Sequence, residues 1–213
     1  MEVRDLGTME YGACLDVQRQ LHADVAAGRH PGCVLVVEHP PVATLGRRGT
    51  PDEVFDKELP VFHIGRGGKA TLHAPGQLVV YPIVHLGEGN RDVRAWVRHL
   101  EAFVKDLLAQ HGIASHTKVD LPGVWTDATQ KKIASIGIEI KDWTSLHGIA
   151  VNVTLEPDVF QRIDPCGLGA SVMTNMVREG ADVDMDAARA WVLAHAATHF
   201  ASFAVRATIP RSS

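Results

Sequence analysis

Cys166 is the residue whose neighbours most favour nucleophilic chemistry. It stands between Pro165, which stiffens the chain before it, and Gly167, which frees the chain after it. Neither neighbour belongs inside a packed helix or strand, so the sequence predicts a cysteine in a turn. A free cysteine is more often a small apolar filler than a nucleophile, because a nucleophile needs a nearby cation or base that lowers the thiol pKa from about 8.5.

Two adjacent lysines can supply that cation, and their positions separate them. Lys131 lies in a polar turn, whereas Lys132 begins a run of alternating apolar residues and has a side chain committed to one face of a sheet. We therefore predict that Lys132 is the partner of the nucleophile. The other cysteines, Cys14 and Cys33, lie in apolar helical and strand patterns and are expected in the core.

A glycine-rich segment over residues 65–84 is the third candidate for chemistry. It sets three glycines beside Arg66, continues as a short β-like run, turns at Pro-Gly and ends in the apolar strand Leu78–Val84. Such a loop lets a backbone approach a ligand, while the strand holds it still. Alone it is at least as typical of an ordinary tight hairpin, but Lys132 and Cys166 together with it indicate a site.

Histidines offer a competing arrangement. His147 or His73, with Cys166 and Asn152, provides the residue types of a cysteine hydrolase, although the local signatures of those enzymes are absent. Within the glycine-rich segment, Arg66 and His73 are expected to have little core to fill. Their removal is therefore predicted to damage substrate use more than folding.

Composition limits the partners. The chain has 213 residues, a net charge of -4 and scattered basic residues, which argues against nucleic acid or an anionic membrane as the main partner. No stretch approaches the roughly 20 apolar residues that span a bilayer, and residues 1–12 lack a secretion-signal pattern. Three cysteines without a C-x-x-C pattern fit a reducing compartment, so we expect a cytoplasmic protein.

His195 and His199 have metal-ligand spacing but no third ligand in view, so we expect surface histidines and no metal site.

Periodicity predicts the elements that must position these residues. Helical spacing predicts helices over 10–27, 92–111 and 186–203, with Asp92 capping the second and Asp184 or Asp186 capping the third. Apolar or alternating runs predict strands over 33–38, 42–45, 61–64, 78–84, 124–126, 133–140 and 146–155, and a helical turn is expected over 157–163. We expect one domain over 1–213, a sheet with flanking helices, and a disordered end over 211–213.

Five motifs in order resemble one family. They are the run from Arg66 to Tyr81, Gly123-Val-Trp125, Lys132-Ile-Ala-Ser-Ile-Gly137, His147-Gly-Ile-Ala-Val-Asn152 and Pro165-Cys-Gly167. Together they resemble the octanoyltransferases of lipoate biosynthesis, also called lipoyl(octanoyl) transferases of the LipB type, over about Leu35 to Leu168. The family has His-Gly-Pro-Gly-Gln with an aromatic residue before the histidine, whereas this chain has Ala74 and Leu72 at those two places. These departures bear on the expected shape of the acyl pocket.

The resemblance implies an α/β (α+β) fold like that of the biotin and lipoate protein ligases, with a mixed, largely antiparallel sheet and flanking helices. It implies an acyl thioester on Cys166 and a Lys132 that lowers the thiol pKa. The implied substrate-binding residues are Arg66, Gly67, Gly68, Lys69, Ala70, Thr71, Leu72, His73, Ser135, Ile136, Gly137, Gly148, Ile149 and Ala150.

The implied reaction moves an octanoyl group from octanoyl-acyl carrier protein to a lysine of a lipoyl domain. The expected acceptors are the lipoyl domains of 2-oxoacid dehydrogenases and the glycine cleavage H protein, and the enzyme is expected to be a monomer. Thioester exchange is nearly balanced in energy, so no ATP, metal or other cofactor is expected. Backbone N–H groups near Gly76, Gln77 or Gly167 are candidate oxyanion donors. The alternatives are an ATP-dependent lipoate protein ligase and a non-catalytic protein that binds lipoyl domains.

Overall fold

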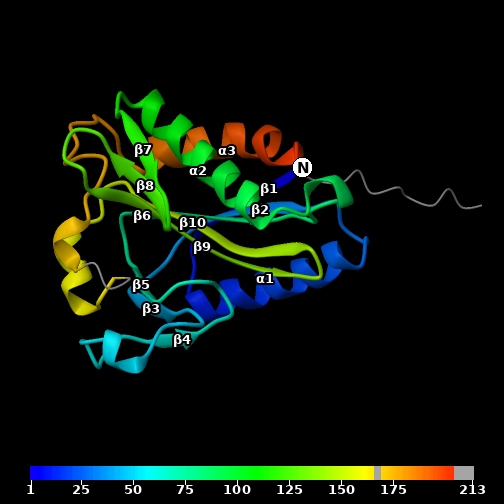
Figure 1. Ribbon diagram of the computed structural model, residues 1–213, viewed down its shortest axis with the longest axis horizontal. Coiled ribbons are helices and arrows are strands. Elements are labelled where there is room, and N and C mark those ends of the chain that lie inside the picture. Colours follow the sequence, from blue (N-terminus) through cyan, green and yellow to red (C-terminus); the bar gives the residue numbers. More distant parts are fainter. Residues whose placement is uncertain (166–168, 204–213) are drawn as a thin grey trace, which may run out of the picture.

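The computed structural model describes residues 1–165 and 169–203, and it consists of two sheets with helices packed around them (Figure 1). The larger sheet has strand order β1-β2-β6-β10-β9-β8-β7 and the smaller has order β4-β3-β5. The strands are β1 Glu2–Thr8, β2 Cys33–Glu38, β3 Val42–Leu45, β4 Val61–His63, β5 Ala70–His73, β6 Gln77–Ile83, β7 Ser115–Lys118, β8 Leu121–Thr126, β9 Lys132–Lys141 and β10 Thr144–Asn152. The helices are α1 Tyr11–Ala26, α2 Val93–Gln110 and α3 Met185–Ala201, with 3-10 turns at Pro51–Glu53, Glu88–Asn90, Pro157–Arg162 and Ala170–Val172.

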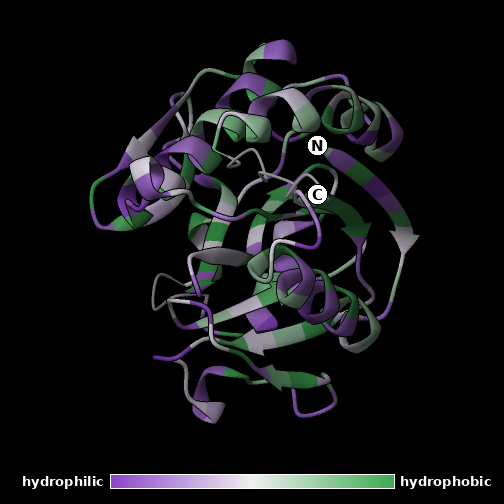
Figure 2. Ribbon diagram, turned by 90° about the vertical axis from the view of Figure 1, so that its right-hand side faces the viewer, coloured by the Kyte–Doolittle hydropathy of each residue, from purple (hydrophilic) through white to green (hydrophobic). Residues whose placement is uncertain are grey.

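The large sheet is the middle layer. Helix α1 packs on one face against β6 and β10, while α2 and α3 pack side by side on the other (Figure 1). Because both faces are covered, the central strands β2 and β6 are apolar along nearly their whole length, and Figure 2 shows the apolar strands inside a shell of more polar helices. The predicted fold class is therefore confirmed.

Most neighbouring strands run antiparallel, as expected. The described exceptions are β1 with β2 in the large sheet and β3 with β4 in the small one, which run parallel. Two strands, β1 and β7, lie in segments for which the sequence predicted no strand. Both are edge strands of the large sheet, with short or largely polar sequences that give little apolar alternation.

The helix ends follow the predicted caps closely. The Asp92 carboxylate accepts the backbone N–H groups of Arg94 at 2.8 Å and Ala95 at 3.0 Å. Of the two caps proposed for α3, Asp184 is the one at the N-cap position, where it accepts the N–H of Ala187 at 2.8 Å. The predicted helical turn before Pro165 is the 3-10 turn Pro157–Arg162.

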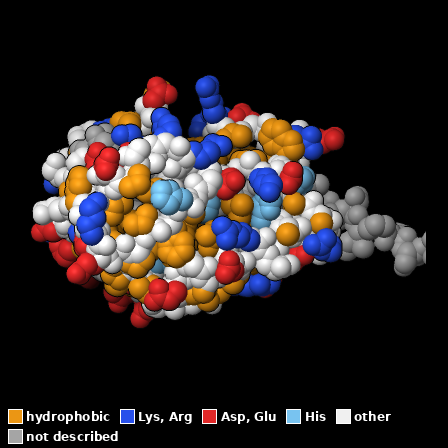
Figure 3. Space-filling view, turned by 90° about the horizontal axis from the view of Figure 1, so that it is seen from below, with side chains coloured by type: hydrophobic (Ala, Val, Ile, Leu, Met, Phe, Trp, Pro, Cys, Tyr) orange, Lys and Arg blue, Asp and Glu red, His pale blue; other side chains and the backbone are white. Residues whose placement is uncertain are grey.

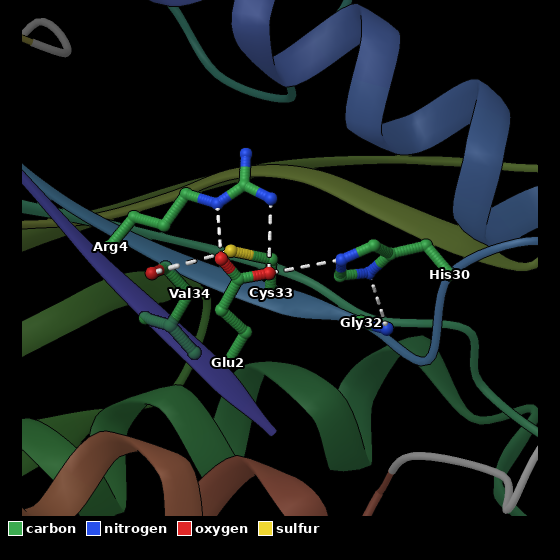
Figure 4. Close-up of polar contacts among 6 residues, drawn as sticks. All are labelled: Glu2, Arg4, His30, Gly32, Cys33 and Val34. Carbon is green, nitrogen blue, oxygen red and sulfur yellow. Dashed lines mark hydrogen bonds and ion pairs between the residues drawn. The ribbon is translucent and has the colours of Figure 1, made fainter.

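Two of the three cysteines are core residues, as predicted. Cys14 and Cys33 are fully buried, and burial raises the pKa of the Cys14 thiol to about 12 and that of Cys33 to about 11. Figure 4 shows the surroundings of Cys33, whose sulfur lies 3.8 Å from the carbonyl oxygen of Val34 beside the Glu2–Arg4 ion pair of β1. Neither thiol is therefore suited to nucleophilic chemistry.

Charge is mixed on the surface. On the face seen in Figure 3, Lys and Arg side chains are interspersed with acidic and apolar ones and form no continuous basic stripe. Within residues 1–165 and 169–203, no helix is both long and apolar enough to cross a membrane.

Candidate active site

A cavity of about 470 Å³ opens between the glycine-rich loop and strands β9 and β10 of the large sheet. Twelve of the fourteen substrate-binding residues expected from the sequence line it; the exceptions are Ala70 and Leu72. Those twelve are Arg66, Gly67, Gly68, Lys69, Thr71, His73, Ser135, Ile136, Gly137, Gly148, Ile149 and Ala150. Lys132 lines the same cavity, so the fold brings together residues from three separate sequence motifs.

The sheet register explains how two of these motifs meet. In the β9–β10 pair, Gly137 lies opposite Gly148 and Ser135 lies opposite Ala150, so the two segments form one continuous wall. A Cβ on Gly148 would lie 2.4 Å from a backbone oxygen of β6, and one on Gly137 would lie 2.9 Å from Cδ of Arg66. The absence of side chains at both glycines allows the close packing here, and at Gly137 it lets the arginine lie across the wall.

Arg66 is part of the cavity's frame, which corrects the expectation that it fills little core. Its side chain is buried, and the guanidinium donates to the Thr44 carbonyl at 2.7 Å, to the Thr44 hydroxyl at 2.9 Å and to the Gly67 carbonyl at 2.9 Å. These bonds tie the loop to β3. Removing the arginine is therefore expected to affect folding as well as substrate use.

His73 is likewise buried, again contrary to expectation. Burial lowers the pKa of its imidazole to about 3, and its Nδ1 lies 2.7 Å from Oε1 of Gln77. The ring also stacks on Tyr11 with a centroid distance of 5.9 Å. His73 is thus a neutral, fixed side chain in the cavity wall at neutral pH.

The two departures from the family pattern lie away from this wall. Leu72 and Ala74 are buried in a small apolar core between the smaller sheet and the 3-10 turn Pro157–Arg162, and neither lines the cavity. Their effect on the acyl pocket, which the sequence left open, is therefore not through direct contact with this cavity. Alternation along β5 sends Leu72 to the face opposite its neighbours Thr71 and His73.

The two lysines differ as predicted. Lys131 is exposed, whereas Lys132 is 5% exposed and lines the cavity. The ammonium nitrogen of Lys132 lies 5.9 Å from the centroid of the Trp125 ring. Its aliphatic stem passes over Gly123, where a Cβ would approach Cε to 2.7 Å and Nζ to 3.3 Å.

The predicted nucleophile, Cys166, lies outside the described residues, as does Gly167. The described chain on either side is held near the cavity. On one side Asp164 donates its N–H to the carbonyl of Glu53 at 2.7 Å; on the other, Thr174 donates its N–H to the carbonyl of Lys132 at 3.0 Å. The Glu53 carboxylate in turn accepts the N–H of Ala70 at 2.8 Å, beside the glycine-rich loop.

The competing hydrolase arrangement does not assemble among the described residues. Asn152 Oδ1 accepts from Gln77 Nε2 at 2.9 Å and contacts neither histidine as a triad asparagine would. His147 lines the cavity with a strained φ of 60°, and its Nε2 lies 3.7 Å from the Glu139 carboxylate. Burial lowers the pKa of the His147 imidazole, although Glu139 opposes this shift.

Two further predictions need correction. The N–H of Gly76 donates to the Glu38 carboxylate at 2.7 Å and that of Gln77 to the Ala74 carbonyl at 3.2 Å, so two of the three candidate oxyanion donors are already engaged. The third, Gly167, lies outside the described residues. His195 is an exposed residue as expected, but His199 is partly buried and stacks on His99 with a centroid distance of 4.0 Å. Within the described parts of the chain, no group of three or more His, Cys, Asp or Glu side chains is placed to hold a metal ion.

Several cavity residues were not predicted. They include Tyr11 from α1, Tyr81 from β6, Val97 from α2, the turn residue Asp120 and the first two residues of β8, Leu121 and Pro122. Tyr11 and Val97 carry no local signal, because each is one apolar position on an amphipathic helix face. Tyr81 alone stands inside a motif that carried the family resemblance.

Comparisons with known proteins agree with this geometry. The family model described as the lipoyl protein ligase A/B catalytic domain matches residues 10–197. The chain is 43% identical to an octanoyltransferase of Syntrophotalea carbinolica over 92% of both chains, and 43% identical to one of Geobacter metallireducens over 83% of this chain and 82% of the relative.

Solved structures show the same fold at low identity. A lipoate-protein ligase A bound with ATP superposes with a TM-score of 0.71 and 17% identity, covering 95% of this chain and 85% of that one. A biotin protein ligase from Aquifex aeolicus in complex with biotin and ATP gives a TM-score of 0.56 and 17% identity, with coverages of 95% and 72%. The family match, the octanoyltransferase relatives and the cavity agree: this chain belongs to the lipoyl protein ligase A/B family as a LipB-type octanoyltransferase, an acyl-transferring enzyme.

Proposed function

We propose that the enzyme takes an octanoyl group from octanoyl-acyl carrier protein as a thioester on Cys166 and passes it to a lysine of a lipoyl domain. The observation that carries the proposal is the burial of Lys132 in the wall of a largely apolar cavity, on a chain 43% identical to octanoyltransferases. A buried ammonium beside the segment that carries Cys166 is suited to stabilising a thiolate.

The reaction has two steps. In the first, the Cys166 thiolate attacks the donor thioester, the acyl carbon forms a bond to the cysteine sulfur, and the carrier thiol leaves. In the second, the lysine amine attacks the enzyme thioester, the C–S bond breaks, and the amine gives up one proton as the amide forms. Lys132 stabilises the thiolate in the first step and gives its proton to the departing carrier sulfur. The neutral Lys132 amine then takes the proton of the attacking amine in the second step and shares it with the departing cysteine sulfur, which restores the starting state.

The cavity walls suit a saturated chain. Ile136, Ile138 and Ile149 line the cavity, and its volume of about 470 Å³ lies within the range of small-molecule sites. These isoleucines lie on β9 and β10, whose register sets Gly137 opposite Gly148. We place the octanoyl chain along these strands.

We further propose that the acceptors are the lipoyl domains of 2-oxoacid dehydrogenases and the glycine cleavage H protein, and that the enzyme acts as a cytoplasmic monomer. The rival reaction is ATP-dependent ligation of a free acid, and one structural neighbour is a lipoate-protein ligase A bound with ATP. The likeness to that ligase is one of fold, at 17% identity.

The test separates the two reactions by their donors. The enzyme is mixed with a lipoyl domain and either octanoyl-acyl carrier protein without ATP or free octanoate with ATP and magnesium. We expect the lipoyl domain to gain the mass of one octanoyl group only in the first mixture. Modification only in the second mixture would overturn the proposal in favour of a ligase.

A further inference from the structure

Glu101 is a buried carboxylate that the proposed reaction leaves unused. It lies on α2, one turn beyond Val97, which lines the cavity, and the residue is 7% exposed. Its Oε1 atom accepts the backbone N–H of Gly123 at 3.2 Å. Acidic side chains are rarely buried unless they are paired, so a group of opposite charge is expected nearby.

Gly123 joins Glu101 to Lys132. The glycine that donates to Glu101 also packs on the end of Lys132, where a Cβ would lie 2.7 Å from Cε and 3.3 Å from Nζ. The carboxylate and the ammonium therefore both lie against one residue that has no side chain to separate them. Lys132 is 5% exposed, so little water screens the two charges from each other.

The effect of Lys132 on Glu101 has the direction expected for such a pair. Burial raises the pKa of the Glu101 carboxyl, and this rise is opposed by the Gly123 N–H and by three cations, Arg98, Lys132 and Lys105. Arg98 and Lys105 are exposed residues of α2 itself, whereas Lys132 belongs to β9 and is buried. Because the attraction between two charges is mutual, Glu101 in turn stabilises the ammonium of Lys132.

Other charged groups around Lys132 do not replace Glu101. The ammonium of Lys118 lies 3.8 Å from the centroid of the Trp125 ring, from which the Lys132 ammonium is 5.9 Å distant, so Lys118 adds a like charge. Asp120 lines the cavity but is exposed to water, which screens its charge. Glu179 accepts from two threonine hydroxyls at 2.6 and 2.8 Å. Burial and the Lys118 charge both favour a neutral Lys132 amine, and Glu101 opposes them.

We propose that Glu101 is a positioning residue that keeps Lys132 charged in the resting enzyme and makes the neutral Lys132 amine a stronger proton acceptor. The inference rests on the proposed acyl transfer, in which Lys132 gives a proton to the departing carrier sulfur and later takes one from the attacking amine. A carboxylate beside the lysine favours its charged form, so it assists the second of these proton transfers. No proton moves to or from Glu101 itself.

Glu101→Gln separates the charge of this residue from its hydrogen bond. The amide oxygen of glutamine can still accept the Gly123 N–H, but the negative charge is lost. Glu38→Gln is the matched control, because Glu38 also accepts a glycine N–H, from Gly76 at 2.7 Å. A Cβ on Gly76 would meet the backbone of Leu155, so this second glycine packs in a different place.

The ionisation test follows the Cε resonance of Lys132 by carbon NMR as pH is varied. The background is Cys166→Ala, so that no thiolate titrates beside the lysine, and the resonance is assigned by its absence in Lys132→Ala. We expect the pH at which Lys132 loses its proton to fall by about one unit in Glu101→Gln and to stay unchanged in Glu38→Gln. An unchanged midpoint in folded Glu101→Gln, or equal shifts in both variants, would overturn the proposal.

A reciprocal measurement leaves Glu101 in place. The carboxyl resonance of Glu101 is titrated in Lys132→Met, which keeps an unbranched side chain and removes the charge. We expect Glu101 to hold its proton to a higher pH in this variant than with Lys132 present. Identical titrations of Glu101 in the two proteins would refute the interaction even if Glu101→Gln failed to fold.

The kinetic test starts from enzyme that already carries an octanoyl group and is mixed with a lipoyl domain at a series of pH values. The acceptor lysine is the same in every mixture, so a displaced pH profile reports a change in the enzyme. We expect Glu101→Gln to reach half of its maximal rate at a pH about one unit lower, with a lower maximum, because Lys132 is a weaker base. Glu38→Gln should keep the wild-type profile. A rate that is lowered equally at every pH in Glu101→Gln would show a structural role alone and refute the proposal.

The outcomes separate this inference from the proposed function. A wild-type enzyme that never becomes acylated contradicts the proposed function, while the NMR titrations need no acylation and still decide whether the two charges interact. If acylation proceeds and Lys132 titrates identically in all variants, the role of Glu101 is refuted and acyl transfer stands.

Discussion

Gly123 provides the sharpest structural test of how Lys132 is positioned. This glycine lies on β8 with φ of 129°, opposite Ser135 of β9. A Cβ there would lie 2.4 Å from the backbone oxygen of Ala134, 2.7 Å from Lys132 Cε and 3.3 Å from Lys132 Nζ. The backbone oxygen cannot rotate away, so Gly123→Ala must separate β8 from β9 and displace the end of the lysine.

The loss of folding stability expected for Gly123→Ala has two causes. A positive φ costs an alanine about 1–2 kcal/mol, and forcing a methyl group into a filled site costs about 1–3 kcal/mol more. Gly180 provides the matched control, because its φ is 92° and a Cβ there meets nothing within 4 Å. We therefore expect Gly180→Ala to lose only the stability that the positive φ costs.

Urea unfolding measures the difference. We expect Gly123→Ala to unfold at a lower urea concentration than Gly180→Ala at an unchanged slope, by the equivalent of about 1–3 kcal/mol. Octanoyl transfer per folded molecule should fall in Gly123→Ala and stay at the wild-type level in Gly180→Ala. Equal stability of the two variants together with wild-type transfer in both would refute the account of how Lys132 is held.

Three other perturbations follow from the site. Lys132→Ala should raise the Cys166 thiol pKa toward about 8.5, so the thiol should react slowly with iodoacetamide at neutral pH and faster as pH rises. Lys131→Ala should match the wild type. Identical pH profiles of the iodoacetamide reaction in all three proteins would remove Lys132 from the mechanism. Arg66→Ala should destabilise the fold by about 2–3 kcal/mol in urea unfolding, because a buried guanidinium with several hydrogen bonds is lost, and wild-type stability would contradict this role. Burial lowers the pKa of His73 in the folded state to about 3, below its unfolded value near 6.5, so the unfolded chain binds the proton first as pH falls. The free energy of unfolding should therefore decrease as pH drops from about 6.5 toward 3, by up to about 1.4 kcal/mol per pH unit. His73→Gln should flatten that slope, and an unchanged slope would show that another group titrates.

Secondary structure was predictable from the sequence where a periodic pattern of apolar residues ended at a recognisable capping residue. Helix α2 was predictable because its apolar residues keep helical spacing and Asp92 caps it. Strand β1 was not, because a parallel edge strand pairs through its backbone and needs no apolar alternation. The separation of β3, β4 and β5 into a second sheet depends on long-range pairing, which leaves no local pattern.

Some residues of the site were predictable and others were not. The site residues on β9 and β10 were predicted from the family resemblance, and the register of those strands, which sets Gly137 opposite Gly148, explains why they share one wall. The burial of Arg66 was not, since charged residues are usually exposed and its partner Thr44 lies far away in sequence. The burial of His73 was not predictable either, because its ring stacks on Tyr11, which lies far away in the sequence.

The most direct test of acyl transfer through Cys166 is the intact mass of the enzyme after mixing with octanoyl-acyl carrier protein in the absence of a lipoyl domain. We predict an adduct of one octanoyl group on the wild type, lost on treatment with hydroxylamine and transferred when a lipoyl domain is added. The Cys166→Ala protein should carry no adduct, while Cys14→Ala and Cys33→Ala, which change buried core thiols, should carry it. A labile adduct on folded Cys166→Ala, or none on any of these proteins while the lipoyl domain is still octanoylated, would contradict the thioester mechanism.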